Sequence, residues 1–195
     1  MGTDYKVDVG RLLPFPETLS ASGKVYGMEK RYRDPELSLV INDATMVGRA
    51  ENDSETALTA GGTAQYLRPR GAAGKIVLPE EHGLHTMSRQ HGIIRPGLDD
   101  WVYQHLSNNS PTGIWLPLAQ RFERLEERGQ VYPLEEPEVH LWVGEKWSHS
   151  GKWGEPRTGW KNSYHRNWDG YYVKLTLVKQ TEEGGLAERV LRFFR

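Results

Sequence analysis

The segment from Tyr171 to Val178 alternates apolar and polar residues over its whole length. Successive side chains of a β-strand point to opposite faces, so a period of two predicts a strand with one buried face. A polar turn, Thr-Glu-Glu-Gly-Gly at 181–185, and a second apolar segment, Leu186–Phe194, then follow, and together they predict a C-terminal antiparallel β-hairpin. The residues expected on one face of the first strand are Tyr171, Val173, Leu175 and Leu177, and those on the other are Tyr172, Lys174 and Thr176.

Further strand signals are spread along the chain and are separated by turn residues. The 195 residues include 21 Gly and 11 Pro, which favours many short elements over long helices. The expected strands are Tyr5–Val9, a hairpin of Leu37–Ile41 and Ala44–Val47 joined by Asn42-Asp43, a pair formed by Thr63–Leu67 and Lys75–Leu78, and a strand with Val139, Leu141 and Val143 on one face and His140 and Trp142 on the other.

Two short helices are expected between residues 97 and 129. Asp99 or Asp100 would cap the first, which runs through Leu106. The second would begin at Pro117, present the apolar stripe Leu118, Phe122 and Leu125, and end before Gly129.

These elements predict an α+β fold that is mostly antiparallel β, either a sandwich or an open barrel, with two inserted helices and a C-terminal hairpin. We expect a single domain over residues 1–195, in which residues 1–20 form an extended N-terminal arm and residues 144–170 a long tryptophan-rich loop. A loop of that length inside a compact domain is usually functional.

Composition excludes several classes of protein. The chain has no cysteine, which excludes disulfides, thiolate metal sites and cysteine nucleophiles. No apolar run at the N-terminus has the length of a signal peptide, and none elsewhere has the length of a membrane span, so we expect cytoplasmic synthesis and no membrane partner.

All seven tryptophans fall between Trp101 and Trp168, and four of them lie in 144–170. Basic residues are interleaved with them, and residues 140–195 carry 10 basic and 6 acidic side chains, against 6 and 10 in residues 72–139. Trp and Arg are enriched at the anchor positions of protein interfaces. The candidate interface or ligand-binding residues are therefore Trp147, Trp153, Arg157, Trp160, Lys161, His165, Arg166 and Trp168.

Two alternative functions remain, an enzyme that uses residues 140–166 and a carbohydrate-binding module, and a nucleic-acid surface is a further, less favoured interpretation. An enzyme acting on RNA or a nucleotide would need an acid, a base and a cation at its active site. The sequence supplies these residue types, but a general base is assigned from its position relative to the substrate and not from its residue type alone. A nucleic-acid surface is less favoured, because residues 140–170 carry a net charge of only +2. A carbohydrate-binding module would stack sugars on the tryptophans. The residues of the acid–base set would be His140, His149 and His165 with Glu145, Lys152, Arg157, Lys161 and Arg166.

A second group of histidines, His82, His85 and His91, has spacing that could hold zinc. Gly83, Gly92 and Pro79 make a helix there unfavourable, so we expect hydrogen-bonded surface histidines and no metal. The glycine patterns of phosphate-binding and dinucleotide-binding loops do not occur, and no cofactor is expected.

The sequence thus favours a non-catalytic subunit that assembles with itself or with another protein. Opposite charges separate between the middle and the tail of the chain, and no recognisable catalytic motif occurs. A virion or phage-tail component is one context that would suit such a subunit.

Overall fold

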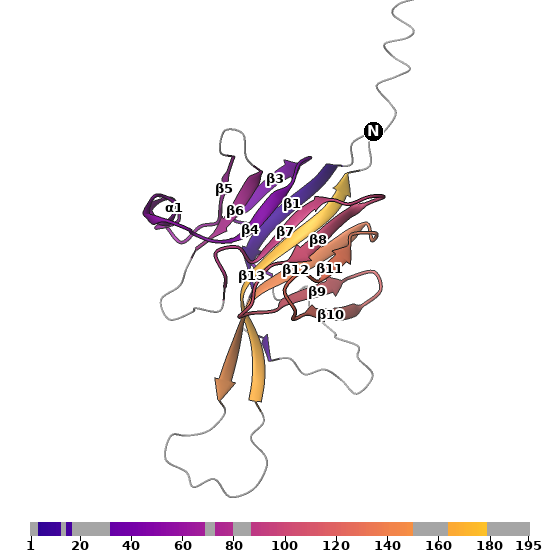
Figure 1. Ribbon diagram of the computed structural model, residues 1–195. Coiled ribbons are helices and arrows are strands. Elements are labelled where there is room, and N and C mark those ends of the chain that lie inside the picture. Colours follow the sequence, from indigo (N-terminus) through magenta and orange to yellow (C-terminus); the bar gives the residue numbers. More distant parts are fainter. Residues whose placement is uncertain are drawn as a thin grey trace, which may run out of the picture.

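In the computed structural model, residues 4–12, 15–16, 32–68, 73–79, 87–149 and 164–178 are described, and they form two β-sheets (Figure 1). All strand pairs are antiparallel except β4 with β6. In spatial order, the larger sheet contains β10 (Arg121–Leu125), β9 (Thr112–Leu116), β12 (Glu138–His149), β13 (Tyr164–Val178), β1 (Asp4–Arg11) and β3 (Leu37–Ile41), and β2 (Phe15–Pro16) pairs with β13. The smaller sheet contains β11 (Val131–Pro133), β8 (Trp101–His105), β7 (Gly92–Pro96), β4 (Thr45–Arg49), β6 (Gly74–Leu78) and β5 (Gln65–Leu67).

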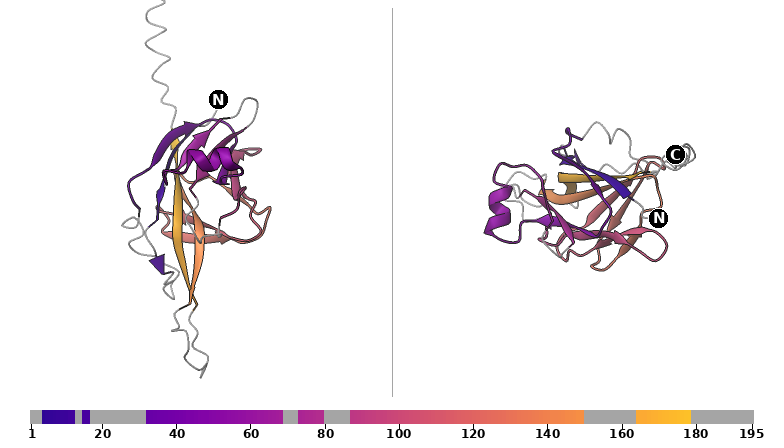
Figure 2. Two further views of the ribbon diagram at one scale, coloured as in Figure 1. Left: turned by 90° about the vertical axis from the view of Figure 1, so that its left-hand side faces the viewer. Right: turned by 90° about the horizontal axis from the view of Figure 1, so that it is seen from above.

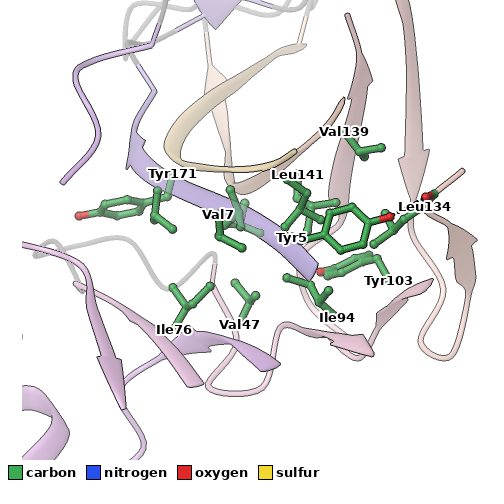
Figure 3. Close-up of a cluster of buried hydrophobic side chains, with 14 of the residues drawn as sticks. Tyr5, Val7, Val47, Ile76, Ile94, Tyr103, Leu134, Val139, Leu141 and Tyr171 are labelled. Atoms are coloured by element: carbon green, nitrogen blue, oxygen red, sulfur yellow. Dashed lines mark hydrogen bonds between the residues drawn. The ribbon is translucent and has the colours of Figure 1, made fainter. Parts of the chain in front are cut away.

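The two sheets share one hydrophobic core. Val7 and Leu141 of the larger sheet face Val47, Ile76 and Ile94 of the smaller sheet (Figure 3), and each of the five is 0% exposed. Burying an aliphatic side chain of this size stabilises the folded state by roughly 1.5–3 kcal/mol. The predicted β-rich, mostly antiparallel character is confirmed, with the sheets packed face to face.

The alternation along the two longest strands is also confirmed. Tyr171, Val173 and Leu175 of β13 lie in the core between the sheets, whereas Tyr172 lies on the opposite face of the larger sheet. On β12, Val139, Leu141 and Val143 are core residues, and Trp142 packs on the opposite face, as predicted.

This opposite, outer face of the larger sheet carries a second buried cluster. Trp142 is 1% exposed there although it points away from the main core. The tyrosine rings of Tyr32 and Tyr172 stack with centroids 4.4 Å apart, and the Tyr172 hydroxyl donates to the Arg33 carbonyl at 2.8 Å. The buried members of this cluster are Leu12, Trp115, Trp142 and Tyr172, with Tyr32 and Phe122 partly buried against them.

The strand edges that β13 would need for the predicted C-terminal hairpin are already paired with other strands. β1 pairs with Tyr171–Val178 along one edge of this strand, and β12 pairs with Tyr171–Thr176 along the other. Both edges are therefore occupied, and the expected partner, Leu186–Phe194, lies outside the described residues. The strand predicted at Tyr5–Val9 is confirmed as β1, but it lies between β13 and β3 in the sheet and is not part of an extended N-terminal arm.

The second predicted hairpin is wrong, although both of its strands form. β3 pairs with β1 in the larger sheet, and β4 pairs with β6 and β7 in the smaller one. Asn42-Asp43 therefore lies where the chain crosses between the sheets. The predicted pairing of Thr63–Leu67 with Lys75–Leu78 is confirmed as β5 with β6.

Neither predicted helix forms, so the α+β class is corrected to mostly β. The first segment is β8, in which Trp101, Tyr103 and His105 alternate as buried residues, and the second is a turn at 117–120 followed by β10. The helix of the described residues is α1 (Asp53–Leu58), which begins after Asn52, whose side chain accepts from the Glu55 amide. No helix in the described part of the chain is long and apolar enough to cross a membrane.

Candidate functional site

The four candidate residues that the structure describes all lie on a two-stranded extension of the larger sheet. β12 and β13 continue pairing beyond the sandwich, from Glu145 opposite Trp168 to His149 opposite Tyr164. We call residues 145–149 and 164–168 the ribbon; it projects below the body of the molecule in Figure 1 and in the left-hand view of Figure 2. The predicted 144–170 loop is therefore wrong at both ends, and residues 150–163 lie outside the described part.

The ribbon leaves the sheet at a pair of glycines. Gly144 has φ of +94°, a conformation that side chains with a Cβ rarely adopt, and the pairing register shifts between Val143 and Glu145. A Cβ added at Gly144 would lie 2.9 Å from the Cα of Gly170, so the two backbones approach each other closely here. This β-bulge marks the boundary between the sandwich and the ribbon.

The register brings half of the predicted site residues together. Trp147 lies directly opposite Arg166, Trp168 lies opposite Glu145, and His165 lies opposite Ser148. The other predicted residues, Trp153, Arg157, Trp160 and Lys161, lie outside the described residues.

Strand alternation divides the ribbon positions into two unlike faces. Residues directly opposite in an antiparallel pair share a face, and residues two apart along one strand share it too. The positions on one face are Glu145, Trp147, His149, Tyr164, Arg166 and Trp168; those on the other are Lys146, Ser148, His165 and Asn167. One face thus has three aromatic positions, Trp147, Tyr164 and Trp168, together with Glu145, His149 and Arg166, and the other has polar positions alone.

Most of the ribbon has no third strand beside it among the described residues. β2 pairs with β13 at Asn167 and Trp168, next to the junction, and residues 145–149 pair with β13 alone. A two-stranded hairpin is marginally stable in water by itself. A further surface against the ribbon would therefore stabilise it.

The remaining three tryptophans are core residues. Trp101 and Trp115 are 6% and 3% exposed and Trp142 is 1% exposed. Trp101 meets Tyr5 edge-on with centroids 5.6 Å apart. The described tryptophans therefore divide into buried core residues and positions on the ribbon.

His140, a member of the proposed acid–base set, lies in a chain of hydrogen bonds on the outer face. Its Nε2 lies 2.7 Å from the Glu138 carboxylate, which also accepts from Lys174 Nζ at 2.9 Å. Because the carboxylate is an acceptor, Nε2–H donates to it, and Nδ1 accepts from the Tyr32 hydroxyl at 2.5 Å. That hydroxyl in turn accepts from the Trp142 indole N–H at 3.0 Å.

This network is better suited to holding the chain in place than to catalysis. His140 is 1% exposed and both of its ring nitrogens are engaged, so neither is available to a substrate. Burial would raise the pKa of Glu138, but hydrogen bonds from Lys174 and His140 lower it, which keeps the carboxylate ionised. The sequence analysis did not identify Glu138 or Tyr32. Glu138 could have been found from its spacing, because residues two apart on a strand share a face and Glu138 is two residues from His140.

The expectation of hydrogen-bonded surface histidines at 82, 85 and 91 is wrong for His91, the one member of the group that the structure describes. His82 and His85 lie outside the described residues, and His91 is fully buried with its ring 5.5 Å from that of His105. Among the described residues no three His, Cys, Asp or Glu side chains are grouped to hold a metal ion.

Comparisons with known proteins found no matching family model, no similar curated protein and no similar solved structure.

Proposed function

We propose that this chain is a non-catalytic assembly subunit whose ribbon binds a protein partner, either another copy or a different protein. The observation that carries the proposal is the continuation of β12 and β13 past the sandwich, with no third strand along residues 145–149 in the described part of the chain. A partner surface against this ribbon would supply the burial that two strands cannot provide for themselves.

The residue types on the ribbon support a protein partner. Trp147, Arg166 and Trp168 occupy one face by register, and Trp and Arg are the residues that most often dominate binding energy at protein interfaces. The opposite face has only polar positions, as expected for a side left in water. The proposal extends to Trp153, Arg157, Trp160 and Lys161 through their place in the sequence between the two ribbon strands. A virion or phage tail is one kind of particle that such a subunit would suit.

A shortened chain tests the proposal. Residues 145–169 are replaced by Asn-Gly, a two-residue turn suited to a hairpin, between Gly144 and Gly170. The core between the sheets lies outside the deleted segment, so the shortened chain should still melt cooperatively. Light scattering over a concentration series should show that the full chain associates and that the shortened chain associates less.

Single substitutions locate the binding face. Trp147→Ala and Arg166→Ala should each weaken association by about 2 kcal/mol or more, the loss typical of an interface anchor. Lys146→Ala, on the opposite face, is the matched control and should change association by less than about 0.5 kcal/mol. Equal effects from both faces, or full assembly of the shortened chain, would refute the ribbon as the binding element. Loss of RNA or oligosaccharide binding with unchanged self-association would replace the proposal with a ligand-binding function.

A further inference from the structure

The four outer strands of the two sheets differ in how well they are protected against pairing with another chain. Natural proteins protect edge strands with charged residues, proline, bulges or short length, because an open edge presents unpaired backbone N–H and C=O groups. β10 carries Arg121, Glu123 and Arg124, β11 has three residues and ends at Pro133, and β5 has three residues. Each of these three edges therefore has a protective feature.

β3, the fourth edge, has none of these features. Its five residues, Leu-Ser-Leu-Val-Ile, include no charge and no proline, and none of them has positive φ. In the described residues β3 pairs with β1 alone, so its other edge is open. In Figure 1 it lies at the opposite margin of the larger sheet from β10.

The side chains of β3 are also only partly covered. Leu37 and Leu39 pack against the main core but remain partly exposed, and Val40 on the other face is 60% exposed. An additional strand at this edge would bury all three.

We propose that β3 pairs with β3 of a second copy of this chain, antiparallel and about a two-fold axis at Leu39. The two larger sheets would then become one continuous sheet across the dimer. A two-fold contact uses the same patch on both copies, so it closes at two and leaves the other surfaces free.

The strand is self-complementary in this register. In this register Leu39 faces Leu39 of the second copy, Ser38 faces Val40, and Leu37 faces Ile41, which is already buried in its own subunit. The new core-side contact is therefore between the partly exposed Leu39 side chains, and no charges are opposed along the strand. Beyond the strand end, Glu36 would face Asn42, and the Glu36 carboxylate already binds Arg11 at 3.0 Å. A heterologous partner strand would have to match this pattern independently, whereas a second copy does so by symmetry.

This inference rests on the proposed function only in treating the chain as an assembly subunit, since β3 and the ribbon are separate surfaces. The two can therefore be tested independently, by examining β3 in the shortened chain that lacks residues 145–169.

A single cysteine gives a direct readout, because the chain has none of its own. In Leu39→Cys, the two cysteines would lie opposite each other on the two-fold axis, where Cα atoms of paired strands are about 4.5–5.5 Å apart, within disulfide range. Mild oxidation of the folded shortened chain should give a covalent dimer. Val131→Cys, at a partly exposed valine on edge strand β11, is the matched control and should remain monomeric at the same concentration. Absence of a Leu39→Cys dimer would overturn the inference.

A charge variant provides the second measurement. Ser38→Lys with Val40→Lys places lysines directly opposite lysines at two points of the proposed contact. Sedimentation of the shortened chain should show the dissociation constant of the dimer rising roughly two- to thirtyfold. Val131→Lys should leave it unchanged, and cooperative melting of each variant confirms that it is folded. A shortened chain that is monomeric throughout, or a dimer that the lysines do not weaken, would refute the β3 contact while leaving the ribbon proposal standing.

Discussion

His91 illustrates how one buried side chain makes the stability of this fold depend on pH. It is 0% exposed, next to the ring of His105. Burial, together with the nearby His105, lowers the pKa of His91 to about 3, whereas an imidazole in the unfolded chain titrates near 6.5. Between these two values the unfolded chain binds a proton that the folded chain does not. The folded state is therefore fully stable above the unfolded pKa and loses stability as the pH falls toward the folded pKa.

We predict that lowering the pH from 7.5 to 5 reduces the free energy of unfolding by about 2 kcal/mol through His91 alone. The variant His91→Leu removes this titration and places an apolar side chain in the buried position. Urea denaturation at the two pH values should therefore show a loss that is smaller by about 2 kcal/mol in the variant than in the unchanged chain. His105 is present in both proteins and serves as the internal reference. An equal loss in both would mean that His91 is protonated in the folded state.

The β9–β10 hairpin shows why an apolar stripe at helical spacing is an unreliable guide to an element. Leu118, Phe122 and Leu125 fit one face of a helix, yet Leu118 is 69% exposed in the turn and Leu125 is buried at the end of β10. Pro117 is suited to a tight turn as well as to the first turn of a helix. The stripe does not survive in the strand: Phe122 packs against the outer-face cluster and Leu125 lies in the main core, on the opposite face of β10. Pairing with β9 therefore overrides the helical spacing of these three residues.

A glycine substitution in this turn distinguishes a hairpin from a helix by the sign of its effect. Gln120 has φ of +48°, a left-handed conformation that is unfavourable for residues with a Cβ. We predict that Gln120→Gly raises the free energy of unfolding by up to about 1 kcal/mol, whereas glycine inside a helix would lower it by about 1 kcal/mol. Ala119→Gly, one position earlier and without positive φ, should be neutral or destabilising. Thermal melts of the two variants provide the comparison, and destabilisation by Gln120→Gly would contradict the hairpin.

At the scale of the whole molecule, the sequence predicts individual strands better than it predicts which strands pair. The alternation in Tyr171–Val178 is local, so it could be recognised without knowing that β1 and β12 occupy both edges. Asn42-Asp43 has the composition of a hairpin turn, but nothing local distinguishes a hairpin from a crossing between sheets. The ribbon was missed for a similar reason. Its alternation is interrupted by Gly144 and Gly170, whose bulge shifts the register.

The shared core leads to a final prediction, that the two sheets unfold as one unit. Ile94 of β7 is 0% exposed and packs in the core that also holds Val7 of β1 and Val173 of β13. Ile94→Ala should lower the free energy of unfolding by about 2–5 kcal/mol, because it leaves a cavity between the sheets. Leu98→Ala is the matched control, since Leu98 follows β7 by two residues and is fully exposed.

Hydrogen exchange can measure this coupling strand by strand. If the sheets unfold together, Ile94→Ala should reduce the protection of amides in β1 and β13 of the larger sheet by the same free energy as in β4 and β6 of the smaller sheet. Leu98→Ala should leave all four strands unchanged. Reduced protection confined to β4 and β6, or two separate melting transitions, would show that each sheet is stable without the other. The physical expectation is the opposite, because Val7, Ile94 and Val173 are buried only while both sheets are in place.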